Sequence, residues 1–317
     1  MPSLRHRSTA LSPSDTAKRA VSPDTATKAA SYYLADRMLL TLDELPAWMH
    51  DNTYILSGYR PPLLTYRRCF GSLFYLHNET GNIYSHLLGA VLFAYFAMQT
   101  ASYIDHHGST VRWYDVTVIA AFLVGAILCL SLSATFHLVA CHSHQVSRQW
   151  NKCDHLGIIV LIVGSFYPPI YYAFYCHPRV LMLYLALIST FGLTGAYFCA
   201  QDRFQTPAYR WTRTLLYIGM GLSGALPLCH SLLWYGWAHT YQALSLTWFL
   251  TMGAAYVAGA LIYACRVPER WYPGQFDYWL HSHQIFHLFV VAAAVCHYIG
   301  VINAFNWHHT SEPICLT

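Results

Sequence analysis

The chain has 317 residues, of which 56% are hydrophobic and only 10% are charged. Soluble domains carry roughly 25% charged residues, so this composition excludes a soluble enzyme and a nucleic-acid-binding protein. The charges are also uneven, because residues 1–79 hold half of all Lys, Arg, Asp and Glu. The sequence therefore predicts an all-α, polytopic membrane protein with a more polar N-terminal part.

The N-terminal part divides into two predicted segments. Residues 1–30 are rich in Ser, Thr, Pro, Ala and basic residues, with almost no large apolar side chains. Such a stretch cannot bury enough surface to offset its ordering entropy, so we expect residues 1–41 to be disordered. They also lack the contiguous apolar stretch of a signal peptide. Residues 42–79 mix large apolar residues with acids and bases, which indicates short amphipathic helices on the membrane surface.

Seven apolar runs are long enough to cross a bilayer, since a transmembrane helix needs ~20 apolar residues. None has Asp, Glu, Lys or Arg in its interior. We therefore predict a seven-helix membrane domain over residues 80–302, followed by a short tail over 303–317. The runs cover residues 81–101, 116–141, 155–176, 180–200, 214–235, 244–265 and 279–302.

Lys and Arg fall almost entirely on one side of this predicted bundle. Sixteen lie in the N-terminal part and in the connections after the second, fourth and sixth spans, and two lie on the opposite side. Because connections rich in Lys and Arg stay in the cytoplasm, we predict a cytoplasmic N-terminus and a C-terminus outside. This is the reverse of a G-protein-coupled receptor. The membrane itself, plasma membrane or endomembrane, stays open.

Three histidines fall at one predicted depth near the cytoplasmic side. His137 ends the second span, and His283 and His287 lie four residues apart at the start of the seventh, on one helix face. Ser133 shares a face with His137, and Asp154 begins the third span at the same depth. Three imidazoles and a water form a common tetrahedral zinc site. The pattern favours a metal site, although separate hydrogen bonds between helices would satisfy the same side chains.

Three sequence blocks carry a resemblance to a known family. They read ETGNIYSH at residues 79–86, SATFH at 133–137 with CHS at 141–143, and PGQFD at 273–277 with SHQIFH at 282–287. In this order and at these helix ends, they resemble the signature of the progestin and adipoQ receptor family, the adiponectin-receptor and haemolysin-III-related group. The match extends over about residues 42–302 and is most similar to the branch that includes fungal zinc-homeostasis members.

The resemblance implies a seven-helix fold with a zinc ion near the cytoplasmic side. By motif position, His137, His283 and His287 would bind the zinc, Asp154 would engage its bound water and Ser133 would line the site. The resemblance also implies a role in lipid and zinc signalling. The implied partners are membrane lipids, either ceramides and other sphingolipids or free fatty acids.

Two functions remain open at this point. In the first, the protein is a slow zinc-dependent hydrolase of ceramide-type lipid amides, with Asp154 as general base and Ser133 as oxyanion partner. In the second, the zinc is structural and an extracellular protein ligand shifts the arrangement of the second and seventh spans. Zinc transport is a weaker third reading, because no chain of acidic residues crosses the membrane. No sequence pattern specifies an oligomeric state.

Overall fold

The computed structural model describes residues 39–106 and 111–310. Within these ranges the chain consists of α-helices and short 3-10 helices, and one isolated β-bridge joins Leu40 to Tyr59. The predicted all-α class is confirmed. The predicted disordered segment falls almost entirely on residues 1–38, which lie outside the described part of the chain.

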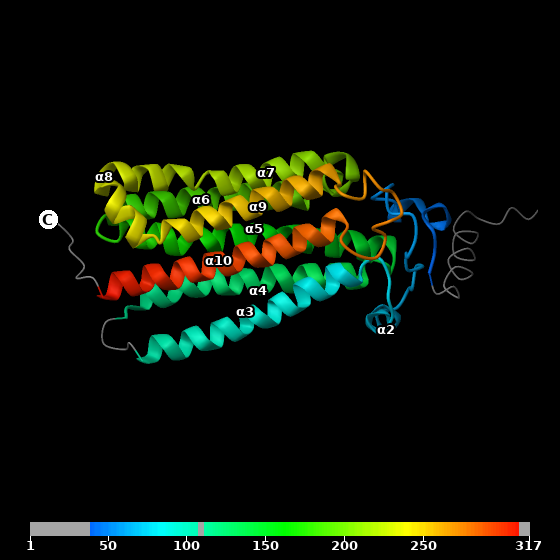
Figure 1. Ribbon diagram of the computed structural model, residues 1–317, viewed down its shortest axis with the longest axis horizontal. Coiled ribbons are helices and arrows are strands. Elements are labelled where there is room, and N and C mark those ends of the chain that lie inside the picture. The colour runs from blue at the N-terminus through cyan, green and yellow to red at the C-terminus, as the bar shows by residue number, and fades with distance from the viewer. Residues whose placement is uncertain (1–38, 107–110, 311–317) are drawn as a thin grey trace, which may run out of the picture.

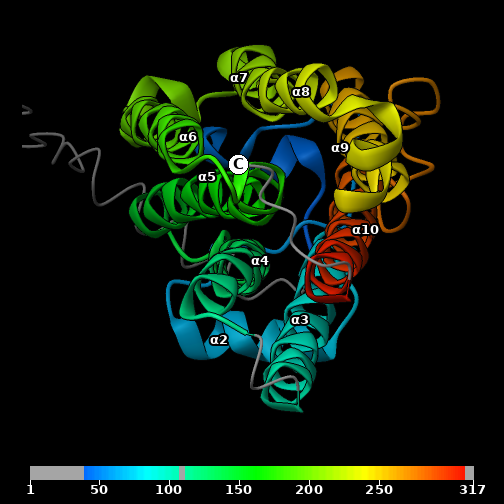
Figure 2. The same cartoon turned by 90° about the vertical axis from the view of Figure 1, so that its left-hand side faces the viewer.

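Seven helical segments in the described ranges are long and apolar enough to cross a membrane, which confirms the predicted number of spans. They run side by side along the long axis of the molecule (Figure 1) and form a closed ring when seen end-on (Figure 2). The helices are α3 (Thr80–His106), α4 (Trp113–Val139), α5 (His144–Phe174), α6 (Pro178–Ala200), α7 (Arg210–Leu222), α8 (Ala225–Ala243), α9 (Leu246–Cys265) and α10 (Ser282–Thr310), of which α7 and α8 together form the fifth segment.

Several helical segments differ in extent from the predicted spans, and α10 runs to Thr310, eight residues into the predicted tail. Helix α5 starts at His144, well before the predicted residue 155, because a helix need not end where its apolar stretch ends. The fifth predicted span is divided into α7 and α8 at Ser223 and Gly224. A Cβ at Gly224 would lie 3.2 Å from the Phe166 ring of α5, so the absence of a side chain lets this break lie close to α5.

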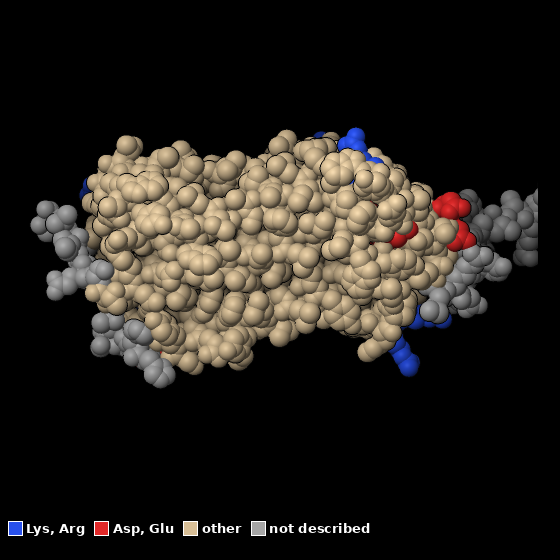
Figure 3. All heavy atoms as spheres, in the orientation of Figure 1, with Lys and Arg blue, Asp and Glu red and all other residues tan. Residues whose placement is uncertain are grey.

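Large apolar side chains cover the outside of the bundle. Leu88, Leu193 and Leu233 have 65%, 74% and 84% of their surface exposed, which a soluble protein would rarely tolerate over a wide area. The space-filling view shows Lys, Arg, Asp and Glu gathered toward the ends of the molecule, with an uncharged belt between them on that face (Figure 3). This surface suits contact with lipid.

Helices α4 and α5 make the most extensive helix pair of the bundle, and glycines make this possible. A Cβ at Gly125 would lie 3.1 Å from the Val160 carbonyl oxygen, and a Cβ at Gly164 only 2.5 Å from the Ala121 carbonyl oxygen. In lipid, helix association depends on close packing rather than on the hydrophobic effect, and small residues allow it. The glycines therefore fix the spacing between α4 and α5.

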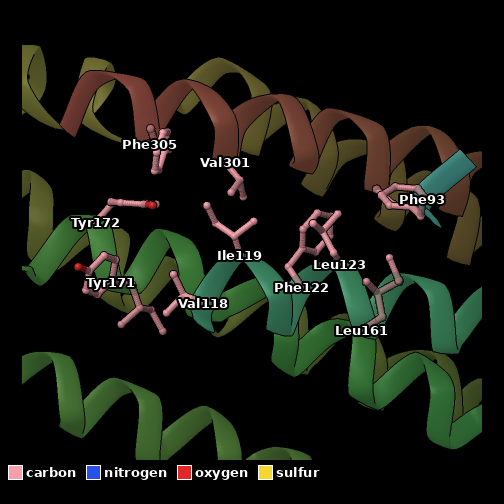
Figure 4. Close-up of a cluster of buried hydrophobic side chains, with 14 of the residues drawn as sticks. Phe93, Val118, Ile119, Phe122, Leu123, Leu161, Tyr171, Tyr172, Val301 and Phe305 are labelled. Atoms are coloured by element: carbon pink, nitrogen blue, oxygen red, sulfur yellow. The ribbon is translucent and has the colours of Figure 1, made fainter. Parts of the chain in front are cut away.

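A tightly packed core fills the space between α3, α4, α5 and α10. Phe93, Phe122 and Phe305 are fully buried there, and Ile119 and Val301 pack between them (Figure 4). Side chains from four helices thus interlock over much of the bundle. This packing gives way to a cavity toward the end at which α4 finishes and α10 begins.

Residues 39–79 form an N-terminal cap over that end of the bundle (Figure 1). The side chain of Asp277, in the connection between α9 and α10, accepts hydrogen bonds from Leu56 N at 2.8 Å and from Ser57 Oγ at 2.6 Å. Asn52 donates to Glu269 in the same connection at 3.0 Å. The N-terminal cap contains η1 (Leu42–Glu44), η2 (Ala47–Met49), α2 (Tyr66–Gly71) and η3 (Ser72–Phe74).

Candidate metal centre

Three histidines from two helices converge beneath the N-terminal cap. His137 lies near the end of α4, and His283 and His287 lie in the first two turns of α10. Their ligand atoms all lie within 4.8 Å of one another, and their ring centroids are 4.8 to 4.9 Å apart. His137 and His287 are buried and His283 is half-buried. The structure thus brings together the three side chains that the sequence singled out, in a group that can hold one metal ion.

The end of α4 is held by an arginine of the N-terminal cap. The guanidinium of Arg60 donates to the carbonyl oxygens of His137 at 2.5 Å and Leu138 at 2.9 Å, and to Ser72 Oγ at 2.8 Å. The last carbonyl groups of a helix have no partner within the helix. Arg60 supplies one here, and it thereby fixes the backbone that carries His137.

Glu79 fixes the orientation of the His137 ring through a hydrogen bond to Nδ1. Its Oε2 accepts a hydrogen bond from His137 Nδ1 at 2.7 Å and another from the Asn82 side-chain amide at 2.6 Å. With the proton on Nδ1, the lone pair of His137 lies on Nε2, a buried atom without a hydrogen-bond partner among the described residues. Metal-ligating histidines commonly have such a carboxylate behind them, which orients the ring and raises its basicity.

His287 is oriented by the same segment of chain. Its Nδ1 lies 3.1 Å from the Asn82 carbonyl oxygen and 3.3 Å from Ser85 Oγ. A carbonyl oxygen only accepts, so Nδ1 carries the proton and Nε2 is free to bind a metal. The ring of His86 stacks on that of His287, with centroids 3.6 Å apart and planes 6° apart. Residues 79–86 thus support two of the three histidines.

Asp154 and Ser133 lie in the same cavity as the three histidines. Both side chains are buried, and both line a cavity of about 410 Å³ that runs inward from beneath the N-terminal cap. Ile158, Ile162 and Met252 contribute apolar walls farther inside. The structure therefore places all of the predicted site residues around one space.

Two further buried residues lie near the site, and of these Arg213 was not anticipated there. Arg213 of α7 is buried, lines the cavity and donates to the Thr206 carbonyl oxygen at 2.9 Å. His281 precedes α10 and is also buried, but its Nε2 lies 3.2 Å from the Asn78 carbonyl oxygen and it does not join the histidine group.

The donor set is compatible with zinc. Zinc prefers imidazole ligands in tetrahedral geometry, and a site with three protein ligands keeps one position for water or substrate. In His137 and His287, Nδ1 is used in a hydrogen bond. The other ring nitrogen, Nε2, is unprotonated and can therefore bind a metal ion. All three histidines line the cavity that Asp154 also lines.

Comparison with known proteins finds sequence similarity over most of the chain. The model of the haemolysin-III-related family matches residues 74–298. The adiponectin receptor protein of Drosophila melanogaster is 44% identical over 257 residues, covering 81% of this chain and 57% of the fly protein. The progestin and adipoQ receptor-like protein 1 of Caenorhabditis elegans is 40% identical over 269 residues, covering 85% and 61%. This chain thus spans about three fifths of the length of these two relatives.

A fungal relative matches over a larger share of its own length. The ADIPOR-like receptor IZH2 of Saccharomyces cerevisiae is 38% identical over 273 residues, covering 86% of this chain and 86% of the yeast protein. The similarity to this yeast protein therefore covers most of both chains.

Proposed function

Because the chain belongs to the haemolysin-III-related family, we propose that it is a zinc-containing, adiponectin-receptor-like protein of lipid and zinc homeostasis that slowly hydrolyses ceramide-type amides. The observation that carries this proposal is the convergence of His137, His283 and His287 in the wall of a cavity that Asp154 also lines. Polar groups at one end of a largely apolar cavity suit a lipid with a reactive polar head.

The chain's own residues supply the remaining chemistry. Zinc, when bound, activates a water molecule and polarises the substrate carbonyl. Asp154 accepts the proton of the attacking water as general base and then delivers it to the departing amine nitrogen. The Ser133 hydroxyl donates a hydrogen bond to the carbonyl oxygen as negative charge develops there. The products are a sphingoid base and a fatty acid, whose chains occupy the apolar part of the cavity.

We further propose that the N-terminal cap and the histidine group face the cytoplasm. The strong excess of Lys and Arg on that side supports this orientation. Cys176 follows α5 at the opposite end of the bundle and is disulfide-bonded, which is typical of an oxidising compartment. Cys69, Cys141 and Cys153, near the N-terminal cap, are free thiols, as expected in a reducing one.

The decisive experiment measures turnover in the purified full-length protein. Zinc-loaded protein in lipid nanodiscs is incubated with a ceramide, and released fatty acid is quantified by mass spectrometry. We expect release that stops when a chelator removes the metal and returns when zinc is restored. A glycerophospholipid of matched chain length, which lacks the amide, is the control and should remain intact.

A second candidate is a receptor in which the zinc is structural. It is favoured by the relatives, two of which are named as receptors in fly and yeast. In this case the purified protein binds zinc and loses thermal stability when the metal is removed, but releases no fatty acid in either state. That outcome would reject the hydrolase proposal.

A further inference from the structure

Two buried thiols lie beside the histidine group without belonging to it. Cys69 in α2 and Cys141 just after α4 have their Sγ atoms 3.9 Å apart. Both are free thiols, with 0% and 2% of their surface exposed. A disulfide bond has a length of about 2.05 Å. The two sulfur atoms would therefore have to move about 2 Å closer to form one.

The backbone around each thiol is fixed by hydrogen bonds. Leu63 N donates to the Cys141 carbonyl oxygen at 2.9 Å, so the N-terminal cap is paired with the turn after α4. Ser72 Oγ donates to the Cys69 carbonyl oxygen at 2.7 Å and accepts from Arg60 at 2.8 Å. The two cysteines are therefore held opposite each other by contacts that do not depend on the thiols.

The cavity gives a small reagent a route to this pair. Cys141 and Arg60 both line it, together with His137. Cys69 and Cys141 otherwise pack among apolar residues, including Leu63, Ile83 and Leu138. A reagent as small as a peroxide can thus reach Cys141 through the cavity.

We propose that Cys69 and Cys141 form a peroxide-sensitive dithiol that closes reversibly to a disulfide and fixes the N-terminal cap to the end of α4. The disulfide would join α2 to the chain four residues beyond His137. Under the proposed orientation the pair faces a reducing compartment, where disulfides are usually transient and redox-sensing. The proposal does not depend on zinc or on lipid hydrolysis.

The chemistry assigns different roles to the two sulfurs. The hydrogen bond with Cys69, aided by the Arg60 charge, outweighs burial and lowers the pKa of the Cys141 thiol. The same hydrogen bond, together with burial, raises the pKa of Cys69. Cys141 lines the cavity whereas Cys69 does not. Because an oxidant that enters through the cavity meets Cys141 first, Cys141 is the attacking thiol and Cys69 the resolving one.

The reaction proceeds in two balanced steps with hydrogen peroxide as the oxidant. The Cys141 thiolate attacks one peroxide oxygen, the O–O bond breaks, and a sulfenic acid and, after protonation, one water form. The Cys69 sulfur then attacks the Cys141 sulfur, the disulfide forms, and the sulfenic oxygen leaves as a second water. In total, two thiols lose two electrons and two protons, and one peroxide becomes two waters.

The test uses the full-length protein, first reduced and then exposed to increasing hydrogen peroxide. Remaining thiols are alkylated, and the digest is analysed by mass spectrometry. We expect a linked peptide pair containing Cys69 and Cys141 to appear at lower peroxide than any oxidation of Cys153, and to disappear with dithiothreitol. Cys153, a partly exposed thiol near the start of α5, is the internal control.

Two variants and a melting experiment complete the test. In Cys69→Ala, the Cys141 thiol should proceed to sulfinic acid, and in Cys141→Ala, Cys69 should stay unmodified. The oxidised native chain should melt at a higher temperature, with the increase reversed by dithiothreitol and absent in Cys69→Ala.

Oxidation of Cys153 before the pair, or sulfinic acid at Cys141 of the native chain without a linked peptide, would overturn the dithiol. A linked peptide without a melting shift would reject the fixing of the N-terminal cap.

Discussion

The carboxylate of Glu79 lies 2.7 Å from Nδ1 of His137 and thereby joins the residue before α3 to the last turns of α4. Asn82, one turn further on, donates to the same carboxylate and offers its carbonyl oxygen to Nδ1 of His287. One short stretch of chain thus orients histidines on two different helices. The start of α3 therefore determines the geometry of the histidine group without contributing a ligand.

The first prediction concerns this carboxylate. Glu79→Gln keeps an oxygen that accepts from His137 but removes the charge that makes the imidazole more basic. Loss of such a supporting partner typically costs about 10- to 100-fold in metal affinity. We expect a decrease of this size in zinc affinity, measured by competition with a fluorescent chelator. An unchanged affinity would mean that the 2.7 Å contact has no part in metal binding.

The second prediction separates the metal ligands from other buried histidines. His283→Ala should abolish stoichiometric zinc, measured by mass spectrometry of the metal, because two imidazoles do not complete the site. His297 is the matched control, since it lies in the same helix, is buried, and its Nδ1 is 3.0 Å from Met252 Sδ. His297→Ala should lower the melting temperature by leaving a cavity and should keep its zinc. Full zinc occupancy in His283→Ala would remove that residue from the ligand set.

The third prediction tests Asp154 as the general base. Asp154→Asn preserves shape and hydrogen bonding but cannot take the proton of the attacking water. Ceramide hydrolysis should fall by about 10²-fold or more, while zinc content stays near that of the parent. Ser133→Ala should show a smaller loss, also without loss of zinc. If zinc is lost together with activity in Asp154→Asn, the carboxylate is a direct ligand and the proposed proton transfer is wrong.

The fourth prediction concerns helix packing. A Cβ at Gly164 would lie 2.5 Å from the Ala121 carbonyl oxygen, and backbone cannot move aside as a side chain can. Gly164→Ala should therefore destabilise the protein by about 1–3 kcal/mol, the usual cost of overpacking, seen as a lower melting temperature. Gly219→Ala is the control, because apart from its own stretch of helix nothing in the described part of the chain lies within 4 Å of its Cβ. A control that melts as low as the Gly164 variant would remove the steric explanation.

The fifth prediction concerns orientation. An epitope tag at the N-terminus should be labelled in intact cells only after permeabilisation, whereas a tag at the C-terminus should be labelled without it. The expectation follows from the distribution of Lys and Arg between the two ends of the bundle. If the protein occupies an endomembrane, selective permeabilisation of the plasma membrane exposes the N-terminal tag alone. The reverse pattern would place the histidine group on the outer side.

The sequence predicted the helical class, the number of spans and the meeting of three histidines for physical reasons that act locally. Apolar length determines which segments cross a bilayer. The spacing of His283 and His287 places both on one helix face, and alternating span direction brings His137 to the same depth. These arguments need no knowledge of which helices are neighbours.

The supporting contacts could not be predicted in the same way. Glu79 stands at the edge of a span, where a charged residue is expected to meet water, and its partner His137 is 58 positions away. Arg60 lies in the segment predicted to form amphipathic helices on the membrane surface, yet it holds the end of α4. The break between α7 and α8 depends on how closely Gly224 lies to Phe166. Each feature arises from tertiary packing, which hydropathy and spacing do not record.

The distribution of the three histidines along the chain has a consequence for how the protein is made. His137 belongs to the second helix to be inserted, whereas His283 and His287 belong to α10, the last. During synthesis His137 is therefore made long before His283 and His287, which follow only after the other spans. A chain interrupted before Ser282 would hold a single ligand. Acquisition of the metal would therefore mark the end of biogenesis, and metal content would distinguish mature molecules from incompletely assembled ones.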